Sequence, residues 1–533
     1  MTAAAINTDE VATVLASLRN SLQTPRAYEA YLTPHNSNPS PQEQNLPPVD
    51  FVVAVVKRIK ASPSFVIVCY SFTDPLLLEK LCRKIYFPSE PLPSGSVALL
   101  QALVFYIVSD LISAHDPLTE QFDCAAYAEL CERNFSSALS TYETLAIPTL
   151  ENVQVLMFGA CRAQEKAKLS LCWTYLAAAH TLCQTMGIHR KSFLQNDPHP
   201  VAEAKRHAFW FLYLMEKNLS LNTGRTSSFQ DYDIDCELFS ISKNPKQAPW
   251  DILNLASVGF ARIQGKVYDQ LYSASAVTQH PTKKASIVEQ LATELLQTRD
   301  QICSVDISNS YFRDALECLM ISTDFMYYSV LTMIYRAQTS TSHATEISSQ
   351  CYEAARLSLR AHLKTFEHFV PGENHFRTID FVNWYVFAIF INWIVLYCSF
   401  APYVIVFTHA MATFDEDDIT LLRETVNALN QLKEVNSGVR RLFDVCKAFL
   451  NTAEVISRSQ KKVDGVHRQD DGSLVLSPFS GEAIATGDLA WPGGMADFDM
   501  SGMDISAFLG NWLGTNRPVT DMLNLDSDAD VLN

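Results

Sequence analysis

Two helical segments in residues 167–238 constrain the fold more than any other part of the sequence. In the first segment, apolar side chains recur with the i, i+3, i+4, i+7 spacing that places them on one face of a helix. They are Leu169, Cys172, Trp173, Leu176, Ala179, Cys183 and Met186. The second segment, around Phe209 to Leu221, is apolar over most of its circumference, which is typical of a buried helix. Gly187 and Gly224 follow the two segments, where a helix end favours a residue that tolerates positive φ.

The same periodicity continues along most of the chain. Helical patterns run over Phe51–Ala61, Thr73–Tyr86, Ser94–Ser113, Asp123–Ala146, Asn152–Gln184, Trp250–Tyr272, Thr282–Asp300, Ser310–Arg336 and Ser348–Phe369. Strand-like alternation between turn signals is nearly absent, and no repeat of fixed period is visible. We therefore predict an all-α fold, a large single multi-helix domain with a disordered N-terminal leader and a C-terminal acidic tail.

Shifts in composition divide the chain into three parts. Residues 1–50 are polar and rich in proline, which predicts a disordered leader. Residues 51–455 carry the helical patterns, and 48% of the whole chain is apolar, which is ample for a large core. Residues 456–533 begin as a polar linker and continue as a tail in which aspartates alternate with isolated large apolar side chains.

One apolar segment supports two interpretations. Residues Phe381 to Phe407 carry no charge, and a membrane span needs only about 20 such residues. However, Asn383 and Asn392 would need hydrogen-bond partners in a membrane, and residues 399–402 break the run. We therefore expect a helix from Trp384 to Cys398 that is buried in the core and makes no membrane contact, and a membrane span stays as the alternative.

Charge and cysteine usage argue against several classes of function. A net charge of −17 disfavours binding of nucleic acid through bulk electrostatics, and the densest basic cluster is only residues 57–60. The 13 cysteines include no C-x-x-C pair, which indicates a reducing compartment and predicts no metal site. Cys161, Cys172 and Cys183 are evenly spaced and are expected to be buried on one stripe. No known catalytic motif occurs, so the sequence predicts neither catalytic residues nor a cofactor.

A set of motif residues spans both helical segments and the turn after them. In chain order the set is Trp173, Gly187, His189, Arg190, Arg206, Trp210, Tyr213, Gly224, Arg225, Asp233 and Asp235. In this order the residues resemble the fungal-specific transcription factor domain, the helical middle region of the zinc binuclear cluster regulators. Residues 402–429 resemble a later part of the same domain, so the resemblance covers roughly residues 50–455. Thr226 and the run 215–217 depart from the family pattern.

The resemblance implies a nuclear transcriptional regulator. It also implies that the regulator is specific for one pathway, such as a secondary-metabolite gene cluster. Most family members open with six cysteines that hold two zinc ions, whereas the first cysteine here is Cys69. We therefore expect this sequence to lack the zinc cluster, so that DNA binding would need a missing region or a partner. The partner would be another transcription factor or a second copy. The alternatives are a coregulator that does not bind DNA and, third, a membrane-associated protein or an enzyme.

Several motif side chains have expected structural roles. His189 and Arg190 follow a helix end, where positive charge interacts favourably with the helix dipole. Arg225 is expected to form an ion pair with the aspartates of the turn at residues 231–235. Trp173 and Trp210 are expected to anchor the core. A ligand-sensing role for the turn is the alternative.

The tail carries a second candidate site. Its large apolar residues include Trp491, Phe498, Ile505, Phe508, Leu509 and Trp512. The last four fall at i, i+3, i+4 and i+7 in the stretch Asp504–Leu513, which favours a short amphipathic helix. Acidic-hydrophobic alternation is typical of activation segments that dock into a groove of a coactivator or of the transcription machinery. The alternative is a tail helix that packs back on the domain.

Overall fold

The computed structural model describes residues 46–70, 76–89, 91–338, 347–369, 400–434 and 437–467. Within these ranges every regular element is a helix and no strand occurs, which confirms the all-α prediction. The leader up to residue 45, the expected buried helix Trp384–Cys398 and the whole acidic tail lie outside the described residues.

Most helices have bounds close to the predicted ones, but the predicted stretch Asp123–Ala146 forms two helices, α7 and α8. They are α2 (Val49–Ala61), α3 (Phe65–Cys69), α4 (Leu77–Tyr86), α5 (Ser94–Ser113), α6 (Leu118–Gln121), α7 (Cys124–Ala138), α8 (Tyr142–Ala146), α9 (Leu150–Glu165), α10 (Leu169–Thr185), α11 (Lys191–Leu194), α12 (His199–Thr223), α13 (Ala248–Val267), α14 (Ala274–Val277), α15 (Pro281–Cys303), α16 (Arg313–Arg336), α17 (Ser349–Phe369), α19 (Ala401–Thr413), α20 (Glu416–Leu432) and α21 (Ser437–His467). Two short elements complete the set, a 3-10 turn η2 (Asp231–Asp233) and a π-helical continuation of α13, η3 (Tyr268–Tyr272).

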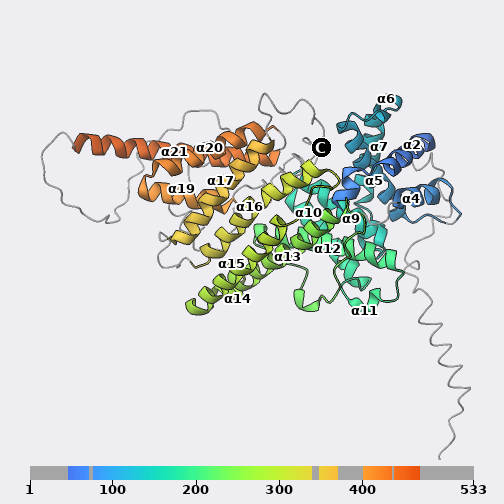
Figure 1. Ribbon diagram of the computed structural model, residues 1–533, viewed down its shortest axis with the longest axis horizontal. Helices are drawn as coiled ribbons and strands as arrows, with labels where there is room; N and C mark the ends of the chain where they lie inside the picture. Colours follow the sequence, from blue (N-terminus) through green and yellow to red (C-terminus); the bar gives the residue numbers. More distant parts are fainter. Residues whose placement is uncertain are drawn as a thin grey trace, which may run out of the picture.

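The helices follow one another along the long axis of the molecule roughly in chain order (Figure 1). The elements from α2 to α12 lie at one end, α13, α15 and α16 cross the middle, and α19 to α21 lie at the other end. Consecutive helices pack against each other in this series: α12 on α13, α13 on α15, α15 on α16, and α16 on α17, which also contacts α19 and α20. One cluster of buried apolar side chains extends from Phe51 to Ala453, so the described helices share a continuous core.

Helix α5 illustrates why the apolar segments are helical and buried. Its bounds are the predicted ones, and its apolar side chains cover most of its circumference. Among the described helices it alone is long and apolar enough to cross a membrane, and 83% of its most apolar window is buried inside the protein. The helices α3, α4, α7 and α9 surround it, as expected for a core helix of a large helical domain.

The predicted helical stretch Asn152–Gln184 is interrupted and forms two helices. Helix α9 ends at Glu165 and α10 begins at Leu169, because Ala167 adopts a left-handed conformation with φ of 55°. Cys161 therefore lies on α9 while the other two evenly spaced cysteines lie on α10, so the expectation of a single stripe was wrong. All three are buried, and burial raises the pKa of each thiol, as expected for structural rather than reactive cysteines.

Helix α21 continues as far as His467. The expected boundary between the helical domain and the linker, at residue 455, therefore falls inside a helix.

Candidate functional site

The first signature segment ends α10 with a glycine turn. Gly187 has φ of 69°, and the amide of Ile188 donates to the carbonyl of Cys183 at 2.9 Å, which closes the helix end. Ile188 is fully buried, so the chain folds back onto the last turn as predicted. A methyl group on Gly187 would lie 2.4 Å from the ring of Phe193, so a close approach adds to the need for glycine.

The end of α10 is tied to the Asp-rich turn. The backbone carbonyl of His189 accepts hydrogen bonds from the amides of Asp235 at 3.2 Å and Cys236 at 3.0 Å. Arg190 forms an ion pair with Asp233, and the His189 ring lies 3.6 Å from the same carboxylate. The carboxylate of Asp235 accepts a hydrogen bond from the amide of Lys191 at 2.7 Å, at the start of α11. The Gly-Ile-His-Arg segment is therefore one half of a polar joint.

Helix α12 supplies the other half of this joint. The indole N–H of Trp210 donates to the carbonyl of Glu237 at 2.9 Å, and Trp210 is fully buried as the expected core anchor. Arg206 lies between the carboxylates of Glu203 and Glu237, at 2.6 and 3.0 Å. The phenol of Tyr213 donates to Asp231 at 2.7 Å. We call residues 187–191 and 225–237, together with the face of α12 that they contact, the α10–α12 joint.

Two further charges of the joint are buried, and both lie in the run 215–217 that departs from the family pattern. Glu216 accepts hydrogen bonds from the hydroxyl of Ser227 at 2.6 Å and from the amide and hydroxyl of Ser228 at 2.5 and 2.9 Å. Lys217 is 1% exposed; its ammonium donates to the carbonyl of Phe229 and lies 3.4 Å from Asp231. The sequence signal for these buried charges is the adjacent pair Glu216 and Lys217 within an otherwise apolar helix.

Arg225 differs from the expectation. Its side chain is exposed, and its guanidinium lies over the ring of the half-buried Trp173, 5.4 Å from the centroid. The ion pairs that hold the turn at residues 231–235 come instead from Arg190 and Lys217. Gly224, with φ of 63°, turns the chain at the end of α12 and directs Arg225 towards α10 rather than towards the aspartates.

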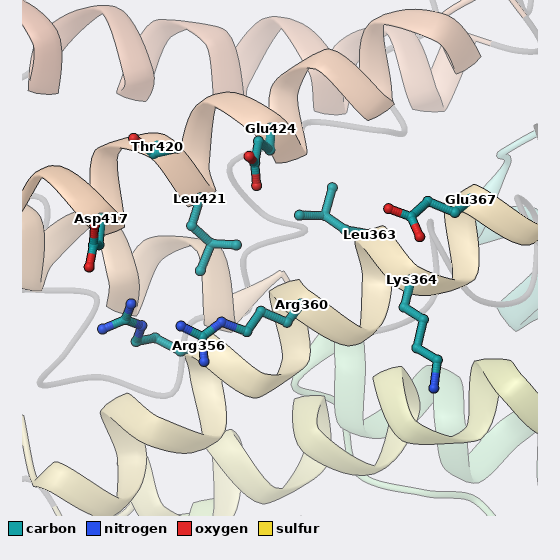
Figure 2. A pocket seen from close by; sticks show the side chains of 9 residues that line it. All are labelled: Arg356, Arg360, Leu363, Lys364, Glu367, Asp417, Thr420, Leu421 and Glu424. Carbon is teal, nitrogen blue, oxygen red and sulfur yellow. The ribbon is translucent and has the colours of Figure 1, made fainter.

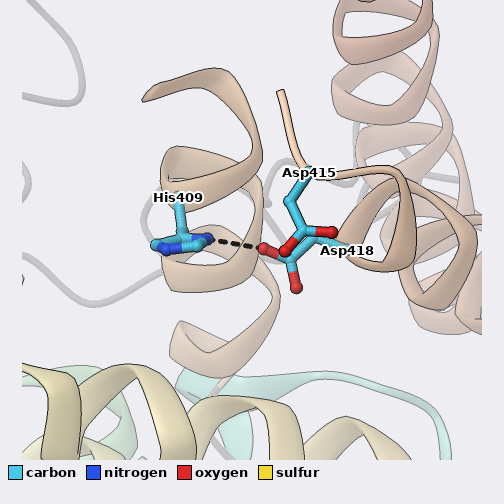
Figure 3. Close-up of side chains that lie close together, drawn as sticks. All are labelled: His409, Asp415 and Asp418. Carbon is cyan, nitrogen blue, oxygen red and sulfur yellow. Dashed lines mark hydrogen bonds and ion pairs between the residues drawn. The ribbon is translucent and has the colours of Figure 1, made fainter. Parts of the chain in front are cut away.

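A second polar cluster lies where α17, α19 and α20 meet. The carboxylate of Asp418 is fully buried and accepts hydrogen bonds from the Tyr352 phenol at 2.9 and 3.0 Å and from the ring of His409 at 2.7 Å. The Tyr352 ring stacks on His409 with centroids 3.7 Å apart, and the guanidinium of Arg356 lies 3.5 Å from Asp418. Figure 3 shows His409 of α19 facing Asp415 and Asp418 at the start of α20.

The same three side chains offer ligand atoms within 4.8 Å of one another, as a metal site would require. Both oxygens of Asp418 already accept hydrogen bonds, and Asp415 caps α20 by accepting from the amide of Asp417 at 2.8 Å. The cation of Arg356 beside Asp418 would also repel a metal ion. The arrangement therefore fits a buried carboxylate that joins three helices better than a metal centre.

A groove of about 380 Å³ runs next to this cluster between α17 and α20. Figure 2 shows the guanidinium groups of Arg356 and Arg360 close together below Leu421, whereas Lys364 points away from α20. Acidic side chains of both helices line the same groove, including Glu367, Asp417 and Glu424. Its charges are mixed and most of its polar side chains are exposed, so it selects no ligand class.

The described helices thus define a helical protein whose signature residues hold helices together. Residues 88–300, from the segment before α5 to α15, match the model of the fungal specific transcription factor domain, and the chain carries this domain. The α10–α12 joint lies inside the matched region.

Curated relatives are fungal transcriptional regulators. The chain is 26% identical to an uncharacterised transcriptional regulatory protein of Schizosaccharomyces pombe, over 64% of this chain and 54% of the relative. It is 27% identical to an ABC-transporter-regulating transcription factor of Aspergillus fumigatus and 26% identical to one of Aspergillus oryzae, in each case over 54% of this chain and 34% of the relative. The chain thus spans between about a third and just over half of the length of these relatives. No solved structure matches it.

Proposed function

We propose that the chain is a nuclear, pathway-specific transcriptional regulator, in which the helical domain is a regulatory scaffold and the acidic tail recruits the transcription machinery. The observation that carries the proposal is the match of residues 88–300 to the fungal specific transcription factor domain. The family and the relatives above are regulators rather than enzymes. Two relatives are named for regulating ABC transporters, which supports a narrow set of target genes; a secondary-metabolite cluster and a transporter gene are both candidates.

The activation role rests on the tail. Four apolar residues of the tail have the i, i+3, i+4, i+7 spacing that predicts one helical face among aspartates: Ile505, Phe508, Leu509 and Trp512. Such a face can dock into an apolar groove, where each aromatic anchor contributes about 2 kcal/mol or more. The acidic residues keep these side chains in water before they bind.

A coregulator that reaches DNA through a partner is the second candidate function. The densest basic cluster, residues 57–60, is partly neutralised in the structure, because Arg58 pairs with Asp116 at 2.6 Å and Lys60 with Glu79. Association with a second transcription factor, or with a second copy that carries further segments, would supply the DNA contact. Purified full-length chain that retards promoter DNA unaided would eliminate this candidate.

The activation role is tested by tethering the full chain to a heterologous DNA-binding domain in a reporter strain. We expect activation, and a loss of about tenfold or more when Phe508 and Trp512 are both replaced by alanine, since two anchors are removed. Phe479→Ala, a matched aromatic change outside the predicted helix, should leave the reporter unchanged. A silent intact fusion, at normal protein level, would contradict the activation role. A fluorescent fusion that stays outside the nucleus would contradict the location.

A further inference from the structure

A cavity of about 360 Å³ lies between α4, α9 and the first turns of α12, with one wall from Tyr70. We call it the α4–α9–α12 cavity. Its walls are mainly apolar and include Leu77, Leu81, Leu150, Met157 and Val201. Small-molecule sites in proteins are typically concave, about 300–1,000 Å³ in volume and apolar apart from a few polar groups. The volume of this cavity lies at the lower end of that range, and its walls have the same mainly apolar composition.

Gln154 of α9 is a polar side chain built into the apolar wall. It is only 5% exposed, and it lines the cavity. Among the described residues, no side-chain or backbone group forms a hydrogen bond with its amide. The amide is open to the cavity rather than sealed in the core, so a ligand that enters the cavity can replace the water that hydrates it. The amide offers both a donor and an acceptor.

His207 of α12 provides a second polar group in the lining of the cavity. It is 7% exposed and its ring stacks on Phe239 with centroids 3.9 Å apart, which fixes the orientation of the imidazole. Burial lowers the pKa of His207 to about 4, so the ring is neutral at physiological pH and has one donor and one acceptor nitrogen. Neither nitrogen has a hydrogen bond within the part of the chain that the structure describes.

The charged residues that line the cavity favour an anion. Lys80 and Lys205 contribute two cations, and Glu151 contributes one anion. The carboxylate of Glu151 forms an ion pair with the ammonium of Lys84 at 3.9 Å. Lys205 forms an ion pair with Asp197 at 2.7 Å, which holds the ammonium in place. An ammonium has three N–H donors, so two of them stay available for a ligand.

We propose that the α4–α9–α12 cavity binds a small molecule that has an apolar body and one carboxylate group. The apolar body would contact the leucine and methionine walls, and the carboxylate would accept hydrogen bonds from the ammonium of Lys205 and from the Gln154 amide. The inference deepens the regulatory role proposed above by naming its ligand class. It is nevertheless tested by binding to the purified chain, independently of any reporter.

The test uses the purified full-length chain and hydrocinnamate, isocaproate and indoleacetate as probes, with binding followed by ligand-detected NMR and calorimetry. We expect saturable binding of at least one carboxylate, with affinity at least about tenfold above that of its amide or of phenylpropylamine. Ala204→Phe, which fills the cavity from α12, should abolish binding. Absence of saturable binding for all three carboxylates, or equal binding of the amine, would overturn the proposal.

Gln154→Met separates a binding role from a structural one. This change removes the unpaired amide, so the melting temperature should stay the same or rise while the carboxylate binds at least about fivefold more weakly. Gln101→Met is the matched control, because Gln101 is an equally buried glutamine on α5 that does not line the cavity; binding should be unchanged. A Gln154→Met variant that is destabilised and still binds fully would show that the amide serves folding alone.

Discussion

The ammonium of Lys217 lies 2.7 Å from the backbone carbonyl oxygen of Phe229, in a position that is 1% exposed. The same cation lies 3.4 Å from Asp231 and 5.2 Å from the ring centroid of Tyr213. Helix α12 and the turn that follows it are thus joined by a buried charge. Burial of a lysine is tolerated only where hydrogen bonds and an opposite charge compensate the loss of water.

Replacement of Lys217 by methionine should therefore destabilise the protein although it makes the core more apolar. The Phe229 carbonyl would keep only the Ser227 hydroxyl as a donor, and Asp231 would lose its cation, at a cost of about 1–3 kcal/mol in the free energy of unfolding. Urea titration followed by circular dichroism measures this. Lys191→Met is the matched control: it removes an exposed pair with Glu237, which is worth at most about 1 kcal/mol. Equal stability of the two variants would show that the buried contact contributes little.

Asp418→Asn should loosen the packing of α17, α19 and α20. The change removes the charge that accepts hydrogen bonds from Tyr352 and His409 and that faces Arg356. Hydrogen bonds to charged groups contribute about 1.5–3 kcal/mol each, so we expect a loss of that order, with faster hydrogen exchange in α19 and α20.

The control for that change is its neighbour. Asp417→Asn alters an exposed carboxylate in the first turn of α20 and should cost at most about 1 kcal/mol through the helix dipole. If both variants unfold alike, the buried cluster is not what holds these helices.

The sequence predicts the helices well because their signals are local. Apolar periodicity places α5 and α10, and Gly187 and Gly224 mark two helix ends that need a left-handed residue. The break at Ala167 gives no such signal, since alanine is a strong helix former. It nevertheless adopts φ of 55° between α9 and α10, which pack against each other.

The pairing of charges could not be predicted in the same way. Arg225 is near the aspartates in sequence, but Arg190 and Asp233, which are 43 residues apart, form the ion pair. The choice depends on how α10 and α12 are oriented, and Gly224 turns Arg225 away. Likewise, the cavity that contains Gln154 and His207 exists only once α9 and α12 are placed side by side, so no spacing in the sequence reveals it.

Acid should destabilise the α10–α12 joint through His180. This ring is buried against Phe229 with centroids 4.4 Å apart, and burial, with smaller contributions from His189 and Lys217, lowers its pKa from 6.5 to about 4. Between these two values the unfolded chain binds a proton that the folded chain does not. The contribution of His180 to stability is therefore fully present above pH 6.5 and is lost as the pH falls towards 4, by up to about 1.4 kcal/mol per pH unit.

Urea titrations of the wild type and of His180→Gln measure this difference. The pH range runs from roughly 7.5, about one unit above the pKa of the unfolded chain, down to roughly 4.5, just above the pKa of the folded chain. The variant should lose less stability than the wild type as the pH falls, because glutamine does not titrate. His199→Gln changes an exposed histidine at the start of α12 and should keep the wild-type slope. Parallel curves for the wild type and His180→Gln would mean that His180 takes up a proton equally well in both states, as a ring with access to water would.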